Sequence, residues 1–272
     1  MFNLYGNLTS LDNYISTFKG GYKYVKMFEN TNVYDCSKLN TGIKSYNYYS
    51  IFEYMFNNCK YLIKVPELPA TTLNGSCYQN MFSGCTSLTL VNGTSNITFS
   101  KTVGKSSCEN MFSGCTKLVS TSKFIWSNII FGGDNAFKCT FKNCKAMTQD
   151  INIVVDGFSG VSKSGFESTF FGCSGIKNVS LTIKYSPAER ACYEMFYGCT
   201  SLINKSIVLS TTGVSKSSYE RMFYGCTSLT NAPELPATTL GIKCYSEMFG
   251  NCSSLTTAPI KLPAIKLADY CY

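Results

Sequence analysis

The sequence predicts an α/β solenoid with one short strand and one short helix in each repeat of 26–30 residues. Three observations predict it. One phrase, Met-Phe-x-Gly-Cys-Thr-x-Leu, recurs along the chain, residues around it keep fixed offsets, and a β-rich or Pro-containing segment follows most copies. A single repeat of this length cannot bury its apolar face, so stacked neighbours have to form one continuous core.

Eight copies of the phrase set the domain organisation. Successive cysteine anchors are 26, 30, 29, 29, 26, 27 and 26 residues apart. We therefore expect eight repeats over residues 51–272, with a ninth beginning at the C-terminal end. The anchors are Cys59, Cys85, Cys115, Cys144, Cys173, Cys199, Cys226 and Cys252.

A short helix is predicted before each anchor. Phe stands three residues before every cysteine, and an aromatic residue or Cys stands four residues before that Phe, so both fall on one helical face. The residue directly before each cysteine is always Gly or Asn, the residues that best tolerate a left-handed backbone, which predicts a helix end there. This last row is Asn58, Gly84, Gly114, Asn143, Gly172, Gly198, Gly225 and Asn251.

An extended segment is predicted after each anchor. Proline excludes a helix interior in the outer repeats, at 65–69, 232–236 and 258–263. In the middle repeats β-branched residues favour strands at 97–99, 151–155, 179–183 and 207–209.

Residues 1–50 fit the repeat poorly and are interpreted as an N-terminal cap with a degenerate first repeat. Cys36-Ser-Lys-Leu39 echoes the phrase, but Val33 and Asn32 then occupy the Phe and Met rows. Terminal repeats of solenoids are atypical because they cover an open core. The alternative is that this segment docks onto a larger assembly.

The composition argues against an enzyme, and we predict no catalytic residue and no cofactor. The chain has no histidine, which removes the common general base and the Ser-His and Cys-His systems. Acidic residues fall at repeat-periodic positions, which indicates a solvated face more than paired catalytic carboxylates. The row concerned is Glu53, Glu109, Glu167 and Glu220.

The fifteen cysteines are predicted to be core thiols. A ladder spreads them along a line, whereas zinc needs four ligands around one point, so neither a metal site nor a redox relay is favoured. A second row, Cys77, Cys244 and Cys271, is given the same interpretation. Lys138, Lys142 and Lys145 form either a solvated face, which we favour, or a small anion-binding stripe.

Charge and hydropathy restrict the partners. Only 15% of residues are charged, and the net charge of +8 is scattered, so no nucleic acid is expected. A polar, uncharged surface suits carbohydrate or protein. No apolar run is long enough for a membrane helix, so no membrane insertion is expected, and the first residues do not form an export signal. Insertions such as 92–96 and 157–163 could carry binding, but the sequence identifies no binding residue.

The phrases Met-Phe-x-Gly-Cys and Leu-x-x-Ala-Pro-Glu-Leu-Pro resemble the BspA-type, or treponemal-type, leucine-rich repeats over residues ~50–272. The repeat here is longer, and Met replaces the family's Ala. The resemblance implies a leucine-rich-repeat-like fold and surface attachment to a host glycan or protein. We expect a phage virion component, in a tail or head fibre or as a decoration protein beside other virion proteins. The alternative is an exported adhesin on the bacterial cell surface.

The last residues predict that the natural polypeptide extends beyond Tyr272. Residues 262–272 repeat 235–245 with an offset of 27. The next core residues of that unit would follow Tyr272, so ending there would leave an open stack.

Overall fold

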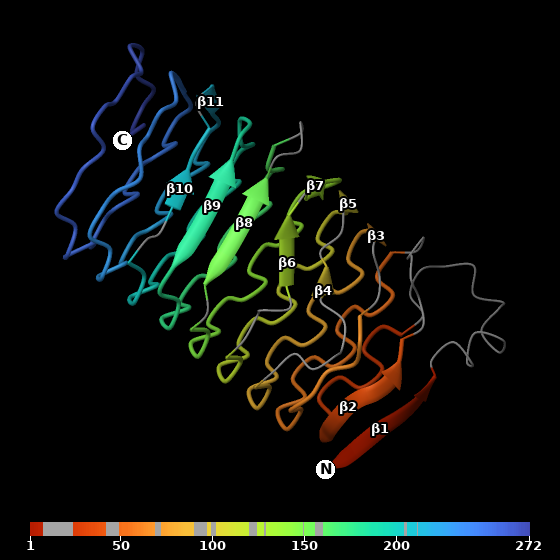
Figure 1. The fold of residues 1–272 in the computed structure, drawn as a ribbon. Coiled ribbons are helices and arrows are strands. Elements are labelled where there is room, and N and C mark those ends of the chain that lie inside the picture. The colour runs from red at the N-terminus through yellow and green to blue at the C-terminus, as the bar shows by residue number, and fades with distance from the viewer. Residues whose placement is uncertain are drawn as a thin grey trace.

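The structure is a computed structural model in which the chain winds as a row of stacked coils, with its two ends at opposite ends of the row (Figure 1). It describes residues 1–7, 24–41, 49–68, 72–89, 97–98, 102–119, 124–127, 129–148, 150–155, 160–203, 206–210 and 212–272.

All strand pairs in the described residues are parallel and join one coil to another. The sheets have the orders β1-β2, β10-β9-β8-β6-β4, β3-β5-β7 and β11-β12. The strands are β1 (Phe2–Asn7), β2 (Val33–Asn40), β3 (Thr72–Leu73), β4 (Ile97–Thr98), β5 (Thr102–Val103), β6 (Phe124–Ser127), β7 (Ile130–Phe131), β8 (Ile151–Val155), β9 (Val179–Ile183), β10 (Ser206–Val208), β11 (Gly213–Val214) and β12 (Thr239–Leu240).

The strand predictions of the middle repeats are confirmed. β8 and β9 have the predicted bounds, while β4 and β10 differ from them by one residue. The Pro-containing segments form no strand in the described residues, and isolated bridges lie only at the residues directly before them, such as Asn231 with Thr257. Proline cannot donate to a ladder, which explains the interruption.

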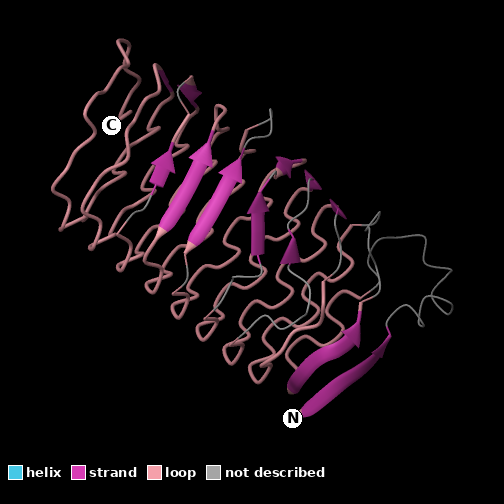
Figure 2. Cartoon of the chain, in the orientation of Figure 1, coloured by secondary structure: helices cyan, strands magenta, loops and turns pink. Residues whose placement is uncertain are grey.

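The predicted helix in each repeat is wrong: the described residues contain no helix, and the segments before the cysteines are runs of turns (Figure 2). The coil that leads to the first anchor, Cys59, illustrates the pattern. The amide of Met55 donates to the Phe52 carbonyl three residues back, whereas the amide of Phe56 donates to Met81 of the next coil at 2.9 Å. Amides therefore alternate between a bond within the coil and a bond along the row, and we call this segment the turn ladder.

Left-handed residues recur every fourth position in the turn ladder. In the coil that leads to Cys59, the residues Ser50, Tyr54 and Asn58 have φ of 54°, 57° and 56°. The Gly and Asn row directly before the cysteines is left-handed throughout, as predicted, but it is the last of three such positions in a coil and ends no helix. A four-residue repeat also returns side chains to one face, and this mimics helical spacing.

Two columns of side chains, one of Phe rings and one of Cys thiols, run through the core. The Phe residues three before the cysteines stack with ring centres 5.4–6.0 Å apart and planes within 14° of parallel. Each anchor thiol donates to the carbonyl of the preceding coil's Phe, over 2.9–3.2 Å. Each of these carbonyls also accepts the amide three residues further along its own coil, so the thiol adds a second bond that joins successive coils.

A coil of the same kind precedes the first anchor, in a register that differs from our alignment. Phe28 stacks on Phe56 at 5.4 Å, and Thr31 takes the cysteine place, with its hydroxyl 3.6 Å from the Cys59 sulfur. Cys36 lies further along, in β2, where its thiol donates to the Lys64 carbonyl. β1 pairs with β2 and covers its edge.

Candidate recognition surface

Three stacked aromatic rings lie on the outside of the turn ladder, two residues before their cysteines. We call Phe171, Tyr197 and Tyr224 the outer aromatic row. Their ring centres are 4.6 and 4.9 Å apart, closer than in the core column, and all three side chains are partly exposed. Side chains at this position face outward because the buried Phe is their neighbour, so a periodic sequence displays them as one strip.

Both ends of the outer aromatic row are covered. The Lys142 ammonium lies over the Phe171 ring, 4.6 Å from its centre. At the other end a Cβ on Gly250 would come within 2.6 Å of the Tyr224 ring, so glycine allows close contact, and Asn251 donates to the Tyr224 hydroxyl at 2.9 Å. The ring faces are therefore occupied, and the row presents ring edges and hydroxyls to a partner.

Two arginines of the turn ladder are each held by a carboxylate of another coil, and one of them, Arg221, lies 5.8 Å from the centre of the Tyr224 ring. Arg190 donates two hydrogen bonds of 3.0 Å to Glu167 and lies 3.6 Å from the Tyr193 ring centre. Arg221 makes a similar bidentate pair with Glu247, at 3.0 and 3.1 Å. Arginine and tyrosine are enriched at the energetic centres of protein interfaces. Since both guanidiniums are fixed in place, little side-chain entropy would be lost on binding.

The glutamate row is not a uniformly solvated face. Glu167 is buried, and besides Arg190 it pairs with Lys138 at 3.2 Å. Glu53, Glu109 and Glu220 are partly exposed. The prediction of a solvated glutamate face is wrong for Glu167. The position of a residue within its own repeat does not reveal which Lys or Arg side chains the neighbouring coils place beside it.

The three lysines weighed as a solvated face or an anion-binding stripe have different surroundings. Lys138 pairs with Glu167, Lys142 covers Phe171, and Lys145 is exposed. The two insertions considered for binding lie largely outside the described residues, which include only 160–163 of them.

The ion pairs of Glu167 are expected to stabilise the folded protein at neutral pH and to be lost in acid. Burial alone would raise the pKa of this carboxyl, but hydrogen bonds from Arg190 and Ser164 and the Arg190 and Lys138 charges lower it below its usual value. A lowered folded pKa stabilises the protein above the unfolded value of about 4.3, and this is lost as pH falls through the folded pKa. We expect Glu167→Gln to be destabilised near pH 7 and to approach the parent below pH 4, as measured by urea unfolding.

Glu220→Gln is the matched control for that measurement, because Glu220 occupies the same row and forms no salt bridge within the described residues. An equal, pH-independent loss in both variants would contradict the assigned role of Glu167.

No metal site is found in the described residues, where no three His, Cys, Asp or Glu side chains group to hold an ion. Of the fifteen thiols, all free, only Cys139 is not fully buried. Burial raises the pKa of the Cys115 and Cys173 thiols to about 12, against a smaller opposing hydrogen bond with the neighbouring coil. Such thiols are protonated at neutral pH, and their geometry fits packing rather than ligation.

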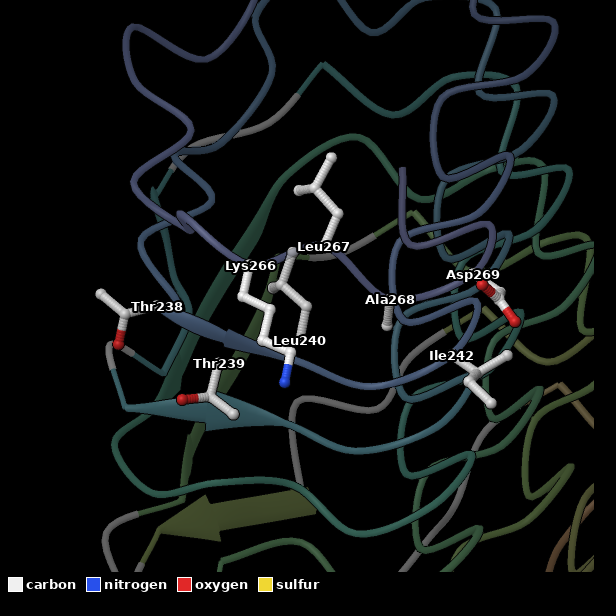
Figure 3. A pocket seen from close by; sticks show the side chains of 8 residues that line it. All are labelled: Thr238, Thr239, Leu240, Ile242, Lys266, Leu267, Ala268 and Asp269. Carbon is white, nitrogen blue, oxygen red and sulfur yellow. The ribbon is translucent and has the colours of Figure 1, made fainter.

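A shallow pocket of about 460 Å³ lies between β12 and the last segment of the chain (Figure 3). Thr239 and Leu240 of β12 form one side, while Lys266 and Leu267 form the other. The last segment does not pair with β12 as β12 pairs with β11, and this leaves the gap. Its two charged groups, Lys266 and Asp269, are of opposite sign and indicate no ligand class.

The outer aromatic row was missed by the sequence reasoning, although a signal exists. Two residues before the cysteines the sequence has an aromatic residue in three successive repeats, and small or polar residues elsewhere. In a predicted helix, the position two residues before the cysteine has no special role. The three rings stack only because successive coils lie directly over one another.

Stacked coils, a thiol column and an aromatic column together define a solenoid of the leucine-rich-repeat class. The chain belongs to the family described as BspA type leucine rich repeat region, whose model matches in six copies over residues 26–163 and 140–272. A crystal structure of a leucine-rich cell surface protein from Faecalibacterium prausnitzii A2-165 is similar at 14% identity, covering 74% of each chain with a TM-score of 0.26. No curated protein matches.

The resemblance drawn from the repeated phrase is thus confirmed. Within the described residues no helix is long and apolar enough to cross a membrane.

Proposed function

We propose that this chain is a non-enzymatic recognition module of a bacterial cell surface and that it binds a protein partner through the outer aromatic row. Membership of the BspA-type family supports a surface role through the resemblance described above. The observation that carries the choice of site is the stack of Phe171, Tyr197 and Tyr224, with the Arg221 guanidinium beside Tyr224, on a chain with only 15% charged residues.

A protein partner is favoured over a glycan by the way the rings are packed. Sugars bind aromatic side chains through the ring face, and here the faces are covered by neighbouring rings, by Lys142 or by Gly250. Ring edges, tyrosine hydroxyls and guanidinium groups remain, and these suit the polar and aromatic surface of another protein.

The test is binding of the labelled full chain to mammalian epithelial cells and to anaerobic bacterial cells. The double variant Tyr197→Ser, Tyr224→Ser should lose at least about tenfold in affinity, in line with the loss of hot-spot side chains. Ser83→Ala with Ser113→Ala is the matched control, because these residues hold the same position in other coils. The control should bind like the parent.

Pretreatment of the cells identifies the partner. Trypsin should abolish binding and periodate should leave it intact. The reverse pattern would mean a glycan partner and would refute the proposed contact. Binding confined to bacterial cells would instead favour the virion component, and finding the native protein in purified phage particles would establish it.

A further inference from the structure

One edge of β1 is open at the N-terminal end of the row (Figure 1). Among the described residues β1 pairs with β2 alone. The Phe2 amide donates to the Asn32 carbonyl, just before β2, and successive residues of a strand direct their backbone groups to opposite edges. Asn3 and Tyr5 therefore direct their amides and carbonyls away from β2, to the edge on which no other described strand lies.

The open edge of β1 has none of the features that usually keep two edge strands apart. Proteins commonly protect such an edge with charged side chains, proline or an inserted residue. Residues 2–7 contain no charged side chain and no proline. Both register shifts between the strands place the extra residue in β2, so β1 has no insertion between Phe2 and Tyr5. Large side chains are exposed there instead, those of Met1, Phe2, Tyr5 and Tyr34.

A projecting ring and a pocket lie side by side at this edge. Tyr5 is 64% exposed, and its hydroxyl accepts a hydrogen bond of 3.0 Å from the Asn3 side-chain amide. The Lys38 ammonium lies 5.8 Å from the centre of the Tyr5 ring, so the ring is held on both sides. The pocket is shallow, with a volume of about 310 Å³ that admits one aromatic ring, and it is lined by Met1, Phe2, Asn3 and Tyr34.

We propose that β1 pairs antiparallel with β1 of a second copy of this chain, about a two-fold axis at Leu4. In this register Asn3 lies opposite the partner's Tyr5, and the two residues exchange both of their backbone hydrogen bonds. Residues that lie opposite each other project from the same face of the sheet, so each Tyr5 ring reaches the pocket beside the other copy's Asn3. One strand supplies both ring and pocket, which is the self-complementarity that a two-fold interface requires.

Charge and size also bear on this pairing. Each chain carries a net charge of +8, so two copies repel overall. Asp35 lies across from Asn3 and Lys38 across from Tyr5. The two-fold axis therefore sets each Lys38 in one cross-strand row with the partner's Asp35, and no lysine faces a lysine.

The dimer is expected to be weak. Six residues give an edge only about 20 Å long, so the contact lies at the small end of specific interfaces. A dissociation constant on the order of 10 μM is expected for such a contact.

Sedimentation equilibrium of the full chain, at concentrations on either side of this value, tests the pairing. The parent should pass from monomer to dimer and form nothing larger, because two-fold pairing leaves no open edge. Tyr5→Ser should raise the dissociation constant at least about tenfold, as the loss of a central aromatic contact does. Asn3→Pro should act similarly, because proline removes an outward donor while the bonds between β1 and β2 remain.

Tyr270→Ser is the matched control. Tyr270 is 74% exposed and has the Lys243 ammonium 5.7 Å from its ring centre, but it lies at the other end of the row. This variant should dimerise like the parent, and Tyr5→Ser should melt at the temperature of the monomeric parent because Tyr5 is exposed. A parent that stays monomeric, a Tyr5→Ser variant that dimerises with the parent's affinity, or association that Tyr270→Ser weakens instead would overturn the proposal. The outer aromatic row takes no part in this contact, so either proposal can fail without the other.

Discussion

Replacing Phe170 by Ala is expected to lower the free energy of unfolding by about 3–5 kcal/mol, the cost typical of removing a buried aromatic side chain. Phe170 is fully buried and stacks on Phe141 and Phe196, with ring centres at 5.6 and 5.4 Å. Its carbonyl accepts the thiol of Cys199. A cavity there weakens contacts to the coils on both sides, and in a solenoid these contacts are what couple one repeat to the next.

The adjacent residue provides the control for this prediction. Phe171→Ala removes the same side chain from the outside of the ladder, where the ring is partly exposed, and should cost about 1 kcal/mol. Urea unfolding followed by tryptophan fluorescence and circular dichroism measures both. Similar losses in the two variants would contradict the assignment of one ring to the core and the next to the surface.

Gly198→Val is expected to destabilise the protein by about 1–3 kcal/mol, because Gly198 has a φ of 68° and a β-branched residue is strained in the left-handed region. Crowding is not the cause. A Cβ at this position would meet its nearest neighbour, the Gly172 Cα, at an ordinary 3.8 Å. Thermal unfolding of the purified variant measures the loss.

Gly198→Asn separates backbone strain from any effect of adding a side chain. Asn58, Asn143 and Asn251 occupy the same row with φ of 56°, 62° and 57°. The Asn variant should therefore stay within about 1 kcal/mol of the parent, since short polar side chains tolerate this conformation. Equal losses for Val and Asn would mean that the left-handed backbone is not what selects Gly at this position.

The periodic core could be predicted from the sequence, because each row of the repeat has one physical role. The Cys row is buried, as is the Phe row apart from Phe249 in the last coil, and the Gly and Asn row is left-handed, as their fixed offsets indicated. The backbone between them could not be predicted in the same way. An offset of four residues fits a helix and a turn ladder equally, and only hydrogen bonds to the neighbouring coil, such as Phe56 to Met81, distinguish them.

The candidate site depends on contacts between repeats, which is why sequence offsets did not reveal it. Phe171, Tyr197 and Tyr224 are far apart along the chain and become one surface only when coils stack in register. The pairing of Glu167 with Lys138 and Arg190 also joins three repeats. Reading every outward position across successive repeats, rather than within one repeat, would have found both.

Thiol titration tests the central claim, a continuous dry core built on the cysteine column, most directly. With the protein folded at neutral pH, at most one of the fifteen thiols, Cys139, should react with a thiol reagent, because the other fourteen are buried. After denaturation without reductant all fifteen should react, and the protein should carry no stoichiometric zinc. Rapid reaction of several thiols in the folded protein, fewer than fifteen after denaturation, or bound zinc would contradict the stacked core described here.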